Sequence, residues 1–201
     1  SKDNVYVVDD RNLMRYMSTG SLRDNILLGD AAFDVTVTDD DSIFIALQDK
    51  IKRFTSFGSE QMASDSRGVN ARFVSISGDN NSLWVGDSGN REIVRYDLQC
   101  KQIGSFGKGK LIVPSAHLDV WATKDGKAWF VNPGKHSINF SNADGNVIKS
   151  WGKTTPKIDG FSGCCNPTDI AITSNGSFVT SEKGMPRVKL YDPKGYFAYI
   201  V

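Results

Sequence analysis

Short apolar runs recur along the chain, and polar residues that favour turns separate each run from the next. Four of these runs open in a similar way, and their first residues lie 40, 45 and 50 positions apart. Each run is rich in β-branched and aromatic side chains and is bounded by Gly, Asn or Asp, which is typical of β-strands joined by hairpins. These four runs occupy residues 33–37, 73–77, 118–122 and 168–172.

Three more apolar runs complete each repeating unit. The second follows a polar turn, the third ends in an aromatic residue, and the fourth is clearest at 102–107 and 147–152. No segment of comparable length keeps a helical period. The pattern therefore predicts four short strands in each unit. The aromatic column at the end of the third strand consists of Tyr16, Phe54, Tyr96 and Tyr191.

This period predicts a β-propeller. One four-stranded sheet cannot bury both of its faces, whereas sheets stacked radially as blades bury each face against a neighbour. The aromatic column then packs between blades, and we favour this role over stacking on a cofactor. We predict an all-β fold: a propeller of four-stranded antiparallel blades that occupies residues 1–201 as a single domain.

The sequence predicts about four and a half to five blades. Strands two to four of a first blade precede residue 33, and four further blades follow, the last one ending at Val201. The first blade therefore lacks its inner strand in this sequence. We expect an open ring, or a ring that residues outside this sequence complete. In the second blade we expect the polar stretch 59–70 to replace the fourth strand.

One blade carries a motif of a known family. Its segment 82–97 has an apolar strand, then Asp-Ser-Gly-Asn-Arg at 87–91, then an apolar strand that ends in Tyr-Asp. This segment resembles the NHL repeat, and the match is partial in the other blades. The stretch 163–191, with Gly-Cys-Cys-Asn-Pro at 163–167, is also similar to uncharacterised bacterial NHL proteins that are often secreted.

The resemblance carries expectations about the whole protein. It implies a six-bladed ring, of which roughly a fifth or more is missing from this chain. It also implies an extracellular or periplasmic location, although a cytoplasmic one stays open. NHL propellers include binding platforms, RNA binders and a lyase, so the resemblance is specific for fold and not for function.

Composition narrows the function classes. The chain has 24 Lys+Arg against 23 Asp+Glu, and this balance argues against a protein built mainly to bind nucleic acid. At 39% hydrophobic residues it can bury a core. No apolar stretch approaches the roughly 18 residues that a membrane span needs. The chain does not begin with a signal peptide, as expected for a cytosolic protein, a processed one or a piece of a longer gene.

The charge is distributed unevenly. Residues 1–100 carry 11 basic and 16 acidic side chains, whereas residues 101–201 carry 13 basic and 7 acidic ones. We favour scattered, solvated side chains as the explanation. The alternative is that the two halves orient a charged partner.

Meander geometry predicts where the chemically distinctive residues lie. If the strands of a blade are a, b, c and d, the b–c and d–a loops share one face and the a–b and c–d loops share the other. The loop 163–167 and the loop that ends beside His117 are d–a connections, and other distinctive residues lie on b–c loops. We predict that this face binds a ligand through Cys164, Cys165, His117, His136, Glu182, Arg187, Asp87 and Arg91.

Three cysteines are too few for a disulfide framework. For Cys164 and Cys165 we favour reduced thiols that fill space as small apolar groups. A vicinal disulfide and a soft-metal site are the alternatives. Structural metal sites usually show paired ligand spacings, which this sequence lacks, and two histidines exclude a three-histidine zinc site within it.

Three aspartates occupy the second position of their inner strands and would lie at one height near the mouth of the central channel. We favour hydrogen bonds from nearby backbone N–H groups as their role. The alternative is a divalent cation held by converging carboxylates, and we predict no other cofactor. Val74 at the matching position of the third blade weakens a ring of ligands. The aspartates are Asp34, Asp119 and Asp169.

No nucleophile elbow, P-loop or dinucleotide fingerprint occurs in the sequence. The leading hypothesis is a non-catalytic propeller scaffold that binds a protein, peptide or glycan through one loop face. The alternative is a cation-dependent lyase or lactone hydrolase with its site at the central channel. A third reading is an RNA-binding NHL domain, which the near-neutral charge disfavours.

Overall fold

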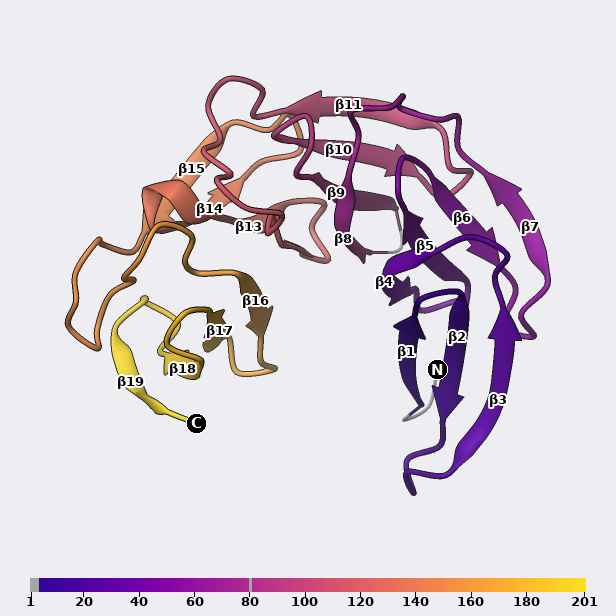
Figure 1. Ribbon diagram of the computed structural model, residues 1–201, viewed down its shortest axis with the longest axis horizontal. Helices are drawn as coiled ribbons and strands as arrows, with labels where there is room; N and C mark the ends of the chain where they lie inside the picture. The colour runs from indigo at the N-terminus through magenta and orange to yellow at the C-terminus, as the bar shows by residue number, and fades with distance from the viewer. Residues whose placement is uncertain (1–3, 80) are drawn as a thin grey trace.

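The computed structural model describes residues 4–79 and 81–201, which form five antiparallel sheets (Figure 1). The first sheet has three strands and the other four have four strands each, all connected as simple meanders. The predicted all-β propeller is therefore confirmed. Figure 1 shows the sheets as blades of an open arc, from indigo blade 1 round to yellow blade 5.

The strand bounds follow the predicted repeat. Blade 1 contains β1 (Val5–Asp9), β2 (Asn12–Tyr16) and β3 (Leu22–Leu27). Blade 2 contains β4 (Ala32–Val37), β5 (Ile43–Leu47), β6 (Ile51–Phe54) and β7 (Glu60–Ala63). Blade 3 contains β8 (Phe73–Gly78), β9 (Ser82–Asp87), β10 (Glu92–Asp97) and β11 (Gln102–Phe106).

The last two blades follow the same order. Blade 4 contains β12 (Val120–Ala122), β13 (Ala128–Asn132), β14 (Ser137–Ser141) and β15 (Val147–Trp151), with a short 3-10 helix, η1 (Pro133–Lys135), between β13 and β14. Blade 5 contains β16 (Asp169–Ile172), β17 (Phe178–Glu182), β18 (Arg187–Tyr191) and β19 (Phe197–Ile200). None of the helical structure in the described residues is long and apolar enough to cross a membrane.

Burial changes across each blade in the way that radial stacking requires. The second strands β5, β9 and β13 are buried along their whole length, because neighbouring blades cover both of their faces. The outer strands β11 and β15 are mostly exposed. Polar residues on outer strands therefore face solvent, whereas those on second strands, such as Asp87 and Asn132, are buried.

The predicted absence of a regular fourth strand in blade 2 is wrong. Strand β7 lies inside the polar stretch 59–70 and pairs antiparallel with β6, with Met62 opposite Arg53. It is an outer strand that faces solvent, so its sequence lacks the apolar signal of a buried strand. Ser64, directly after β7, also contacts β6, because its hydroxyl accepts a hydrogen bond from the Ile51 amide at 3.0 Å.

The core lies between the blades, as predicted. Phe54, Tyr96 and Tyr191 are almost fully buried at equivalent register positions at the end of the third strand. Tyr16 occupies the same position in blade 1 but is only half-buried. Its side of that sheet also carries the exposed Val5 and Val7, because none of the described sheets covers it.

The expectation that residues outside this sequence complete the ring stays a prediction. Within the described residues, successive inner strands β4, β8, β12 and β16 contact one another and line the inside of the arc. This arrangement places the start of every inner strand at the mouth of one channel.

Candidate functional site

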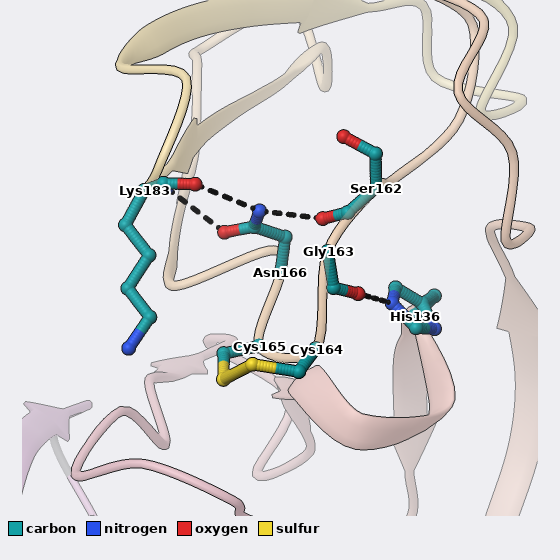
Figure 2. The surroundings of a disulfide bond; sticks show 7 residues. All are labelled: His136, Ser162, Gly163, Cys164, Cys165, Asn166 and Lys183. Atoms are coloured by element: carbon teal, nitrogen blue, oxygen red, sulfur yellow. Dashed lines mark hydrogen bonds between the residues drawn. A yellow bond between two sulfur atoms is a disulfide. The ribbon is translucent and has the colours of Figure 1, made fainter.

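The loop between β15 and β16 carries a vicinal disulfide between Cys164 and Cys165 (Figure 2). Cys164 is exposed, whereas Cys165 is buried. The favoured prediction of two reduced, space-filling thiols is therefore wrong, and the disulfide alternative is correct. Cys164 is exposed, so it does not fill space in a core. Two adjacent cysteines are always close in space, so their spacing in the sequence does not show whether they form a disulfide.

Side chains from blades 4 and 5 fix this loop. Asn166 donates hydrogen bonds through Nδ2 to the carbonyl oxygens of Ser162 and Lys183, at 2.7 and 3.1 Å. The Lys183 amide donates back to Asn166 Oδ1 at 2.9 Å. The ring of His136 hydrogen-bonds the Gly163 carbonyl oxygen through Nε2 (Figure 2). The prediction that His136 neighbours the two cysteines in space is confirmed.

Glu182 and Arg187 form a second group that is internal rather than open to a ligand. Glu182 is buried, and Arg187 donates to its Oε2 from Nε at 3.0 Å. Lys189, which sequence reasoning missed, pairs with the other oxygen of Glu182 and is fully buried. Its ammonium also donates to the carbonyl oxygens of Gly160 and Ile158 at 2.6 and 3.2 Å.

The buried lysine has a structural role in this network. Burial lowers the pKa of Lys189, although the hydrogen bond to Glu182 opposes that effect. Charged groups can be buried in this way only when they are paired and hydrogen-bonded. The network therefore ties the segment 153–161 to blade 5. A lysine placed between the apolar Val188 and Leu190 was the available sequence signal.

Asp87 stabilises its own hairpin. It is fully buried and accepts hydrogen bonds from the Arg72 amide at 2.9 Å and from Asn90 Nδ2 at 2.8 Å. Its nearest cation is Arg67, with Nε at 3.7 Å, and not the neighbouring Arg91. Arg91 is exposed and adopts a positive φ of 56°. Of these residues, only Arg91 remains available on the surface.

His117 lies at the end of the d–a loop, directly before the inner region of blade 4. It is half-buried, and its ring makes no hydrogen bond or ion pair with the residues that the structure describes. The predicted site residues thus fall into separate groups around one face rather than into one pocket. The remaining cysteine, Cys100, is free and buried, and burial raises the pKa of its thiol to about 11.

Two channel aspartates link neighbouring blades by the same arrangement. Asp34 accepts hydrogen bonds from the amides of Val35 at 2.8 Å and of Ile76, in blade 3, at 2.7 Å. Asp119 accepts from the amide that follows it at 2.8 Å and from the blade 5 amide of Ile170 at 2.7 Å. The hydrogen bonds from Ile76 and Ile170 come from the inner strands of other blades. The favoured prediction was hydrogen bonds from nearby backbone N–H groups, and these two bonds also join neighbouring blades.

The channel carboxylates also influence one another. Burial raises the pKa of Asp34 to about 6 and that of Asp119 well above its ordinary value, and the charge of Asp169 adds to both effects. Asp169 itself is exposed and accepts a hydrogen bond from the Ser181 hydroxyl.

The channel cavity has a volume of about 650 Å³ and is lined mainly by β4, β8 and β12. In the described part of the chain, no three His, Cys, Asp or Glu side chains are grouped as metal ligands.

Exposed lysines distinguish the loop face of blades 3 to 5. Their side chains make no hydrogen bond or ion pair within the described residues, whereas the acidic Asp87, Glu92 and Glu182 of these blades are buried and paired. The d–a and b–c connections of these blades therefore present unpaired positive charge. We refer to these residues as the lysine face: Lys108, Lys110, Lys135 and Lys183.

Comparisons with known proteins support the fold. No protein-family model matches the chain, and no curated protein matches it in sequence. A catalytically inactive histidine-to-alanine variant of virginiamycin B lyase from Staphylococcus aureus, solved with Quinupristin, is similar in structure, with a TM-score of 0.74 at 17% identity. That alignment covers 98% of this chain and 66% of the lyase chain.

Two further solved structures show the same likeness. A streptogramin B lyase aligns with a TM-score of 0.70 at 15% identity, over 98% of this chain and 65% of that one. A Bacteroides caccae protein of unknown function aligns with a TM-score of 0.70 at 12% identity, over 100% of this chain and 73% of that one. This chain thus spans about two thirds of the lyase chains. Likeness at such low identity shows the propeller fold alone, and membership of the NHL family stays a prediction.

Proposed function

We propose that this chain is a non-catalytic binding propeller that recognises an acidic protein or peptide segment through the lysine face. The observation that carries the proposal is the unpaired charge of Lys108, Lys110, Lys135 and Lys183, whereas Asp87, Glu92 and Glu182 of the same blades are buried and paired. Unpaired surface cations favour and orient acidic partners.

The loops that present these lysines are held in place by hydrogen bonds. Asn132 Oδ1 accepts from the Ile112 amide at 3.0 Å and links a b–c loop to the d–a loop that precedes blade 4. Asn166 and Lys183 make the equivalent link before blade 5. Loops that are ordered before binding lose less conformational entropy when a partner docks, which favours recognition by a rigid surface.

The proposal can be tested by selecting heptapeptides from a random displayed library on the immobilised protein. We expect the recovered peptides to be rich in Asp and Glu. Replacement of all four face lysines by Gln should weaken the binding of a recovered peptide by about tenfold, because each exposed charge pair contributes roughly 0.2–1 kcal/mol.

The matched control carries Lys101→Gln and Lys194→Gln on the c–d connections of the opposite face, where both residues are exposed. This variant should bind as the wild type does. Recovery of neutral or basic peptides, or equal losses in the two variants, would contradict the proposal. Tighter binding of a short single-stranded RNA than of any recovered peptide would replace it by the RNA-binding alternative.

A second candidate function is a cation-dependent lyase or lactone hydrolase at the channel. The observation in its favour is the position of His117, whose ring is unpaired within the described residues, two residues before the channel carboxylate of Asp119. The similar lyase structure is described as inactivated by replacement of a histidine. An imidazole with an unengaged ring nitrogen can act as a general acid or base toward a substrate within hydrogen-bond reach.

Incubation of the protein with quinupristin and Mg²⁺ distinguishes this candidate from the proposed binding function. Elimination would open its ring without a change of mass, whereas hydrolysis would add one water, and chromatography with mass spectrometry detects both. We expect the compound to remain intact. A ring-opened product that disappears with His117→Ala, together with a stoichiometric bound metal, would establish the enzyme instead.

A further inference from the structure

A groove runs between blades 3 and 4, and its lining includes neither the disulfide nor the channel aspartates. It encloses about 670 Å³, within the usual range of roughly 300–1,000 Å³ for ligand sites. The 107–112 connection and the end of β13 form one end, and the c–d turn 144–147 of blade 4 forms the other.

The floor of the groove is apolar and rigid. Phe106 packs edge-on against Phe130, with ring centroids 5.7 Å apart, and Leu111 beside them is buried. The rim carries two branched side chains, Ile112 and Val147, that are about half exposed, at 49% and 53%. Apolar groups at this degree of exposure can still be removed from water by a partner.

One end of the groove offers hydrogen-bond donors without acceptors. Lys110 and Lys135 line it, and neither ammonium is paired within the described residues. Asn132 lines it too and is 4% exposed; its Oδ1 is engaged by the Ile112 amide, but its Nδ2 has no partner in the described part of the chain. Three donors at one place complement a carboxylate.

The opposite end has the reverse polarity, because Asp144 is the one acidic residue that lines the groove. It comes from the c–d turn, whereas the two lysines come from the d–a loop and from η1. The groove is therefore basic at one end, apolar along its floor and acidic at the other end. This order of charges favours an acidic group of the ligand at the lysine end and disfavours one at the Asp144 end.

We propose that this groove binds a peptide segment in which an acidic residue adjoins an aromatic or branched aliphatic residue, with the acidic side chain at Lys110 and Lys135. The proposal rests on the proposed function and adds the ligand class and its seat. The apolar side chain of the peptide lies over Phe106 and Phe130, and the acidic side chain accepts from the lysine ammoniums and Asn132 Nδ2.

Fluorescence anisotropy with labelled synthetic peptides tests the groove. The probe contains Glu-Asp-Phe-Leu, a neutral partner contains Gln-Asn-Phe-Leu, and an apolar-deficient partner contains Glu-Asp-Gly-Ser. We expect the probe to bind about tenfold more tightly than either partner peptide, since two exposed charge contacts contribute up to about thirtyfold in affinity and one buried aromatic side chain contributes about tenfold or more. Equal affinities for the three peptides, or no binding of the probe, would overturn the groove.

Variants locate the binding within the molecule. Lys110→Gln with Lys135→Gln should abolish the preference for the acidic probe over the neutral peptide. Ile112→Ser with Val147→Ser should weaken the binding of the probe and of the neutral peptide several-fold each. Neither position is buried enough for the change to unfold the chain. Lys101→Gln with Lys194→Gln is the control and should change nothing.

A further pair separates failure of the groove from failure of the proposed function. Lys108 and Lys183 belong to the lysine face but do not line the groove. If Lys108→Gln with Lys183→Gln abolishes probe binding while the two groove pairs leave it unchanged, the groove is overturned and the proposed function stands. If library-selected acidic peptides ignore all four lysines, the proposed function fails as well.

Discussion

Single carboxylates in this propeller act mainly within the fold. Asp87 accepts bonds from two backbone amides of its own blade, and Asp34 links two inner strands. Glu182 holds Arg187 and the buried Lys189. Each of these acids has a partner that raises the cost of its removal. The loop face of blades 3 to 5 therefore carries unpaired lysines, whereas these acidic residues are engaged inside the fold.

Titration of Asp34 should make stability depend on pH. Its folded pKa of about 6, raised by burial, exceeds the unfolded value of about 3.9. Between these values the folded state holds a proton that the unfolded state has released, so this group lowers the free energy of unfolding as pH rises.

Asp34→Asn removes that titration. The difference in unfolding free energy, variant minus wild type, should increase by up to about 3 kcal/mol from about pH 4 to pH 7, measured by urea unfolding at constant ionic strength. The altered hydrogen bonding to Ile76 adds an offset that does not change with pH. A difference that stays constant over this range would show that Asp34 titrates normally in the folded protein.

The redox state of the three cysteines gives a second prediction at this scale. Cys164 and Cys165 are joined, and Cys100 is a buried thiol whose pKa is raised by burial. In a thiol titration, the native protein should react slowly at most. Denaturant alone should expose one thiol, and denaturant after reduction should expose all three. Three reactive thiols in unreduced, denatured protein would contradict the disulfide.

At the scale of elements, the turns of neighbouring blades are fitted closely to each other. Gly145, in the c–d turn of blade 4, has a φ of 82°, and a Cβ there would lie 2.2 Å from the ring of Phe106 in blade 3. Gly184 has the similar φ of 83°, but a Cβ would meet nothing within 4 Å. The two glycines share the conformational requirement and differ in the space around them.

Gly145→Ala and Gly184→Ala therefore form a matched pair. Both should lose about 1 kcal/mol from the positive φ, and Gly145→Ala should lose a further 1–3 kcal/mol or so because Phe106 must move. Urea unfolding measures both values. Equal losses for the two variants would mean that the contact between blades 3 and 4 is looser than the structure shows.

Most of the elements could be predicted because the second strands are buried on both faces and carry apolar runs. Sequence reasoning failed at β7, whose residues Glu60–Ala63 face solvent on an outer edge and carry no apolar period. It also failed to identify Lys189 as a buried residue, since the carbonyl oxygens that pair with it come from the distant segment 153–161. The apolar pattern within a strand indicates which residues are buried. It does not indicate which hydrogen-bond or ion-pair partners come from distant segments.

At the scale of the whole molecule, meander topology predicted which loops share a face. It did not predict which distinctive residues remain free on that face. Asp87 pairs with Arg67, which lies in an irregular stretch, and this contact could not be inferred from the motif at 87–91. The groove between blades 3 and 4 was missed for the same reason, because its residues come from three separated loops and become neighbours only when the blades stack.

The central claim is that the lysine face binds an acidic peptide. Mapping of ¹H–¹⁵N chemical-shift changes during titration with a peptide recovered from the displayed library tests this claim most directly. We predict that the largest changes fall on amides of residues 107–112, 132–136 and 183–185. Changes concentrated on the a–b turns and on the c–d turns 98–101 and 192–196, or along the channel around Asp34 and Asp119, would contradict it.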